Sequence, residues 1–157
     1  MSKFVRSLTI GDAGDPFNGS LDIKFSGKQS MGILEFTVRG VYAGYEVVPP
    51  NPWAIVLILA EYGKNHPLAS SFLTAKELAK SLAKRYGVYS TDPLEVVRTV
   101  YRLRTSLSKL VIAEKLASNG FLPRASNFGK VLIHHNSSLG YRFNLPAKHI
   151  TIDLQGV

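Results

Sequence analysis

Four polar residues between positions 98 and 109 are spaced as one face of a helix would space them. Arg98, Arg102, Thr105 and Lys109 follow one another at intervals of four, three and four residues. All four side chains can donate hydrogen bonds to an anion. Arginine can also donate two parallel hydrogen bonds to a phosphate, or to the O6 and N7 atoms of guanine. This chemistry suits a negatively charged polymer.

The same segment carries an apolar stripe on its opposite side. On a helical wheel the apolar residues occupy a band about 100° wide, and the polar set lies about 180° to 240° away. A solvated helix face usually mixes both signs of charge, whereas here the only acid is Glu95 near the start. A solvated face is the alternative, but the geometry favours a helix that packs on one side and presents cations on the other. The apolar band consists of Val96, Val100, Leu103, Leu107, Leu110 and Val111.

The sequence gives less support for metal binding or catalysis. Neighbouring residues on a strand point to opposite faces, so His134 and His135 cannot easily bind one metal ion. The segment GDAGD at 11–15 lacks the ligand spacing and closing Glu of a calcium loop, and we interpret it as a turn. No carboxylate pair or nucleophile motif stands out, and the chain has no cysteine. We therefore expect no enzyme activity, no metal and no cofactor.

The composition is that of an ordinary globular domain. The 157 residues are 45% hydrophobic and 19% charged, which is enough to bury a core without disulfides. The longest apolar run, at 53–63, is about half a membrane span and contains Glu61. The N-terminus lacks the apolar stretch of a secretory signal. We expect no membrane contact and a cytoplasmic location.

The net charge of +8 is unevenly distributed. Residues 1–50 hold five basic and five acidic residues, whereas residues 51–157 hold fourteen basic and six acidic ones. The excess therefore lies in the C-terminal two-thirds of the chain. This asymmetry indicates a neutral scaffold followed by a part that faces a polyanion, although a charged soluble surface is the simpler alternative.

The first 48 residues predict a small antiparallel sheet with strands at 4–10, 21–25, 32–38 and 45–48. A nearly all-apolar helix at 52–62 should follow, with Asn51 as its N-cap and Trp53 in the core. Turn residues separate these segments.

Two capped helices follow. Thr74 and Glu77 predict a capping box for a helix that stops at Gly87, and Asp92 predicts the N-cap of a helix running to about 110, or as far as 117. Such a closely spaced pair is a helix–turn–helix pattern. The segment 119–129 should be a loop, and 130–145 a β-hairpin. We expect an α+β fold with a sheet subdomain at 1–48 and a helical domain at 49–157.

Two segments now resemble a known family. VVRTVYRLRTSL (96–107) and LGYRFNLP (139–146) resemble the recognition helix and second wing strand of OmpR/PhoB-type winged-helix DNA-binding domains, the effector domains of response regulators. The resemblance implies a winged helix–turn–helix fold with an N-terminal antiparallel β-sheet and a C-terminal β-hairpin wing. It implies sequence-specific binding of double-stranded DNA and a role in transcription regulation. The 92–110 helix would enter the major groove, and the 130–145 hairpin would act as the wing.

The resemblance also implies roles for single residues. Arg98, Thr99 and Arg102 would meet base edges, Arg104 would meet a phosphate, and the wing tip would approach the minor groove or the backbone. Further phosphate contacts are expected from basic residues nearby. The wing-tip and remaining phosphate candidates are His135 and Asn136, and Lys109, Lys76, Lys80 and Arg142.

The expected partner is double-stranded DNA, bound as a homodimer or in tandem because one module buries a modest interface. By the resemblance, the connector at 87–91 would touch RNA polymerase, and the protein would be nucleoid-associated. One alternative is a protein-interaction module that docks on RNA polymerase or a replication factor. A nuclease is a second alternative, but it needs a carboxylate cluster that the sequence does not show.

Overall fold

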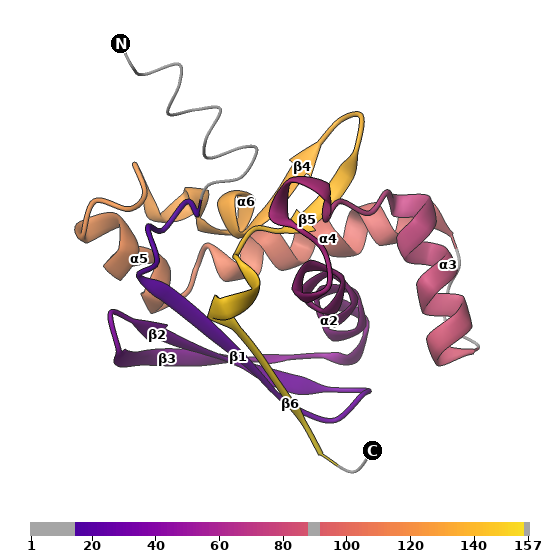
Figure 1. Ribbon diagram of the computed structural model, residues 1–157, viewed down its shortest axis with the longest axis horizontal. Helices are drawn as coiled ribbons and strands as arrows, with labels where there is room; N and C mark the ends of the chain where they lie inside the picture. Colours follow the sequence, from indigo (N-terminus) through magenta and orange to yellow (C-terminus); the bar gives the residue numbers. More distant parts are fainter. Residues whose placement is uncertain (1–14, 88–91, 156–157) are drawn as a thin grey trace.

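The computed structural model describes residues 15–87 and 92–155. A four-stranded sheet forms one layer, helices pack on one of its faces, and a hairpin projects on the side of the helices away from the sheet (Figure 1). The predicted α+β class is therefore confirmed at this level. The strand predicted at 4–10 and most of the connector at 87–91 lie outside the described residues.

Three strands of the sheet form an antiparallel meander, β1 (Leu21–Gly27), β2 (Gly32–Val38) and β3 (Val41–Val48). This confirms the strands predicted at 21–25, 32–38 and 45–48. The fourth strand, β6 (Ile150–Leu154), pairs with β1 in parallel, which gives the order β3-β2-β1-β6. The described strands of the first 48 residues are therefore antiparallel, as predicted, but the sheet also includes a parallel strand that was not predicted. The sequence predicted a boundary between two domains at 48/49. Residues from both sides of this boundary form the one sheet.

Helix α2 (Pro50–Lys64) lies against the buried face of the sheet. Trp53 is fully buried, as predicted, and its indole Nε1 donates to the Lys28 carbonyl at 2.8 Å. The helix begins two residues before the predicted start, and Pro49 precedes it without a side-chain cap. Asn51 therefore lies within the first turn and is not the N-cap.

Both caps predicted for the helix pair are confirmed. At the start of α3 (Ala75–Tyr86), the Glu77 amide donates to Thr74 Oγ1 at 3.0 Å and the Thr74 amide donates to Glu77 Oε1 at 2.8 Å. At the start of α4 (Pro93–Leu107), Asp92 Oδ1 accepts from the Leu94 amide at 3.0 Å. Each helix start is therefore fixed by its own local sequence.

Helix α4 is shorter than predicted. It ends at Leu107, and a separate helix, α5 (Val111–Ser118), begins after Leu110. Leu110 has an extended backbone with φ −76° and ψ 155°, which breaks the helical hydrogen bonding. Lys109 consequently lies in the turn between the two helices.

The rest of the chain leads into the predicted hairpin and back to the sheet. A 3₁₀ turn, η2 (Ala125–Asn127), and a short helix, α6 (Phe128–Leu132), end the segment predicted as a loop. Strands β4 (Ile133–Asn136) and β5 (Gly140–Phe143) form the hairpin. It is shorter than the predicted 130–145, because residues 130–132 belong to α6. Two further 3₁₀ turns, η1 (Leu68–Ser70) and η3 (Ala147–His149), precede α3 and β6.

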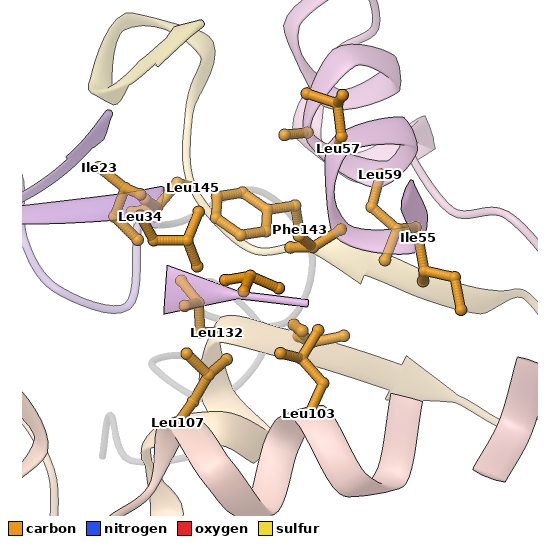
Figure 2. Close-up of a cluster of buried hydrophobic side chains, with 14 of the residues drawn as sticks. Ile23, Leu34, Ile55, Leu57, Leu59, Leu103, Leu107, Leu132, Phe143 and Leu145 are labelled. Atoms are coloured by element: carbon orange, nitrogen blue, oxygen red, sulfur yellow. The ribbon is translucent and has the colours of Figure 1, made fainter. Parts of the chain in front are cut away.

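One hydrophobic cluster joins the helices, the hairpin base and the sheet (Figure 2). Leu103 and Leu107 of α4 contribute to this core, as does Phe143 of β5. Because one side of α4 is held in the core, the direction of its other side is fixed as well. The labelled members of the cluster are Ile23, Leu34, Ile55, Leu57, Leu59, Leu103, Leu107, Leu132, Phe143 and Leu145.

Candidate nucleic-acid interface

The outward side of α4 and the following turn carry the predicted cations. Over residues 96–107 the apolar side of the helix is buried and the polar side is exposed, so this part of the two predicted stripes is confirmed. The prediction was wrong for the end of the apolar stripe: the helix stops at Leu107, Leu110 is half-buried, and Val111 is 68% exposed at the start of α5. The buried residues are Val96, Val100, Leu103 and Leu107, and the exposed ones are Arg98, Arg102, Thr105 and Lys109.

The two arginines of this face differ in their contacts. Arg98 pairs with Glu95 at 3.1 Å, and their side chains are 54% and 44% exposed. An exposed pair of this kind contributes about 0.2–1 kcal/mol, so another anion can displace Glu95. Arg102 has no ion-pair or side-chain hydrogen-bond partner within the described part of the chain. Arg102 is therefore directly available to a ligand.

Three apolar side chains share the outward face, and the sequence prediction missed them. Leu94, Val97 and Tyr101 are 54%, 39% and 68% exposed. They lie about 100° to 160° from Val96 on the helical wheel, outside the apolar band, so the same wheel could have revealed them. The outward face of α4 is therefore mixed, with an apolar strip beside the cations.

Two predicted DNA contacts are buried, and we correct them here. Thr99 is 8% exposed, on the side of α4 that packs into the core. Arg142 is fully buried; it donates to the Leu68 carbonyl at 2.8 Å, and its guanidinium lies 4.5 Å from the centre of the Phe72 ring. Residues 68–73 cover the face of β5 that was expected to be open, so Arg142 holds this segment in place and does not reach a phosphate.

The hairpin offers fewer contacts than predicted. His135 is exposed and stacks on Tyr141, with ring centres 4.6 Å apart. Asn136 Oδ1 accepts from the amides of Ser138 and Leu139 at 2.8 and 3.0 Å. Asn136 therefore stabilises the turn, which leaves His135 as the predicted wing residue that faces outward.

Arg104 is a residue of α4 whose side chain lies near the hairpin strands. Burial lowers its pKa, and its charge acts on both Tyr141 and His134 of the hairpin strands. Its Nε atom is buried and has no hydrogen-bond partner among the described residues. Because a partly buried cation without an anion is unfavourable, this position favours an anionic ligand.

Basic side chains also gather near both ends of α4. An open groove of about 590 Å³ lies beside Pro93 at its start and is lined by lysines of α3. A pocket of about 240 Å³ lies near its C-terminal end. The two ends of the helix are roughly 20 Å apart. The cations of the groove are Lys76, Lys80 and Lys84, and those of the pocket are Arg104, Lys109 and Lys130.

Lys84 and Lys130 were not among the predicted contacts. Lys84 continues the four-residue spacing of Lys76 and Lys80 along α3, and this spacing was visible in the sequence. Lys130 reaches the pocket only because α6 packs on α4, and no sequence pattern indicated that contact.

Within residues 15–87 and 92–155, histidine and acidic side chains do not form any group of three that could hold a metal ion. Over the same residues, no helix combines the length and the apolar character needed to cross a membrane. In comparisons with known proteins, the chain matches no family model, no curated protein and no solved structure. Function must therefore be inferred from the surface itself.

Proposed function

We propose that the chain is a sequence-specific double-stranded DNA-binding protein that acts in transcription regulation. In this proposal, α4 enters the major groove as the recognition helix of a winged helix–turn–helix, and the β4–β5 hairpin is the wing. The resemblance of residues 96–107 and 139–146 to OmpR/PhoB-type domains agrees with this arrangement. A nucleoid-associated location in the cytoplasm belongs to the same proposal.

The two-sided character of α4 is the observation that carries the proposal. Its aliphatic side is fixed in the core and its other side presents Arg98 and Arg102 outward, next to the turn that carries Lys109. The major groove, about 12 Å wide, admits one helix, and arginine can read guanine there. The exposed Val97 and Tyr101 can contact thymine methyl groups in the same groove.

The basic clusters near the ends of α4 support the same docking. Lysines of α3 flank the start of the helix, and Arg104, Lys109 and Lys130 lie near its end. A helix inserted in the major groove has a phosphate backbone on either side. These clusters would therefore hold phosphates and fix the register, while Arg102 reads bases. Dimeric or tandem binding would add the interface area that a single module lacks.

The test compares Arg102→Ala with Lys76→Ala on two kinds of duplex: the preferred duplex, selected from random sequences, and unrelated duplexes. Arg102→Ala should cost about 1–3 kcal/mol on the preferred duplex and little on others, because it removes a base contact. Lys76→Ala should weaken binding to all duplexes and reduce the slope of log K against log salt by about 0.9. Fluorescence anisotropy over a series of salt concentrations measures both effects.

Lys148→Ala is the matched control. Lys148 is an exposed lysine of η3, outside both basic clusters, and its removal should leave the salt slope unchanged. The absence of salt-dependent duplex binding by the unmodified chain would refute the proposal. If Arg102→Ala lowers the affinity for all duplexes equally, Arg102 contacts a phosphate and does not read a base.

The apolar strip on α4 favours a second candidate, a module that docks on another protein such as RNA polymerase or a replication factor. Leu94, Val97 and Tyr101 offer the kind of aromatic and aliphatic anchors that protein interfaces use. The two candidates differ in their response to salt. A protein partner held by this strip should bind with a shallow salt dependence and should lose affinity most with Tyr101→Ala.

A further inference from the structure

The pocket near the C-terminal end of α4 is lined by three basic residues. Its cations come from three places: Arg104 on α4, Lys109 in the turn that follows, and Lys130 on α6. Among residues 15–87 and 92–155, no acidic side chain lines it. Three positive charges around one hollow repel one another unless an anion lies between them. The remaining lining residues are Tyr101, Thr105, Ser108 and Ser126.

Hydroxyl groups complete the donor set. Ser108 Oγ accepts from the Gly129 amide at 2.8 Å, so its own hydrogen is left to donate into the pocket. Thr105 Oγ1 donates to the Tyr101 carbonyl at 3.0 Å and so offers only an acceptor there. Arg104 adds the positive charge of its guanidinium to the lining. A tetrahedral oxyanion with several acceptor oxygens satisfies these donors best.

We propose that this hollow, the Arg104 pocket, binds a phosphate group. Its volume of about 240 Å³ is slightly below the roughly 300–1,000 Å³ typical of sites for drug-sized ligands, so a small phosphorylated molecule fits. The Tyr101 ring and the aliphatic stems of the cations supply apolar wall for the rest of such a molecule. The same chemistry would accept a phosphate of a DNA backbone. The assignment does not depend on DNA binding.

Titration with phenyl phosphate, followed by NMR of the backbone amides and by calorimetry, tests the proposal. The expected result is saturable 1:1 binding that shifts the amides of Arg104, Ser108 and Lys130. Phenol and dimethyl phosphate are the comparison ligands, because one lacks the phosphate and the other carries a single negative charge, as a DNA diester does. Phenol should not bind, and dimethyl phosphate should bind more weakly than phenyl phosphate.

Two variants locate the site. Arg104→Ala and Lys130→Ala should each weaken phenyl phosphate binding by about tenfold or more, since each removes a charge-assisted contact. Lys130 is exposed, so its variant remains informative if Arg104→Ala destabilises the fold. Lys115→Ala is the control, because Lys115 is an exposed lysine of α5 that does not line the pocket.

A competition experiment separates the two sources of phosphate. If phenyl phosphate displaces a bound duplex, the pocket holds a backbone phosphate in the DNA complex. If it binds without displacing the duplex, or if the unmodified chain binds no duplex at all, the pocket is a separate ligand site and stands without the DNA proposal. If phenyl phosphate does not bind but Lys130→Ala lowers the salt slope of duplex binding by about 0.9, the phosphate comes from DNA alone. The assignment is overturned if neither effect is seen, or if Arg104→Ala and Lys130→Ala bind phenyl phosphate as the unmodified chain does.

Discussion

Replacing Gly129 with alanine should separate α6 from α4 and lower the stability of the whole domain. A Cβ atom at Gly129 would lie 2.7 Å from the Arg104 Cα and still closer to the Arg104 carbonyl oxygen. An ordinary contact between carbon atoms is about 3.5–4.0 Å, so the two backbones would have to move apart by about 1 Å. Both atoms belong to backbone within a helix, so no side chain can rotate away to relieve the contact.

Overpacking of this kind costs about 1–3 kcal/mol and occasionally more, and a clash with backbone belongs at the upper end. For a chain of this length, about 3 kcal/mol corresponds to a fall in Tm of roughly 6–12 °C. Urea denaturation and differential scanning calorimetry both measure this loss. The move would also shift the hairpin relative to α4, so duplex binding should weaken although no charge has been removed.

Gly63→Ala is the matched control for Gly129→Ala. Gly63 is also buried within a helix, α2, but the nearest heavy atom to an added Cβ is the Phe143 carbonyl oxygen at 3.9 Å. Alanine there meets ordinary contact and gains helix propensity, so stability should rise by up to about 1 kcal/mol. If the free energy of unfolding of Gly129→Ala lies within about 0.5 kcal/mol of that of the unmodified chain, α6 does not pack on α4 as described. The placement of Lys130 in the Arg104 pocket would then be wrong as well.

Three further predictions concern the elements that hold the site. Burial, together with nearby positive charges, lowers the pKa of His134 from its usual 6.5, so the unfolded chain takes up the proton first as the pH falls. The Tm should therefore decrease as the pH falls through about 6.5 and level off below the folded pKa, and the decrease should be smaller in His134→Phe, measured by calorimetry. Thr74→Ala removes the capping box of α3 and should lower stability by about 1 kcal/mol in urea denaturation, whereas Thr74→Ser should retain most of it. Gly140→Ala should disrupt the bridge between Leu73 and β5, because Gly140 has φ +107° and an added Cβ would collide with the Leu73 carbonyl. The expected result is a loss of hydrogen-exchange protection at the Leu73 amide. Unchanged protection there would contradict the prediction.

Local sequence was sufficient for the features that depend on neighbouring residues. The capping box at Thr74, the cap at Asp92 and the two stripes of α4 follow from spacing and hydrogen bonding within a few residues. The strands β1 and β2 were also predicted, because alternation and turn residues are local signals. The outward direction of Arg102 belongs to this group, since an amphipathic helix can bury only its apolar side.

Tertiary structure alone decided the features that join distant segments. Strand β6 pairs with β1 more than a hundred residues away, and its short sequence gave no sign of a parallel partner. Arg142 alternates with apolar residues and so resembled a surface residue, but residues 68–73 cover that side of β5. The Arg104 pocket exists because Lys130 on α6 meets α4. A sequence pattern tells which side of an element is apolar, whereas what covers the other side is a contact between segments that the pattern does not contain.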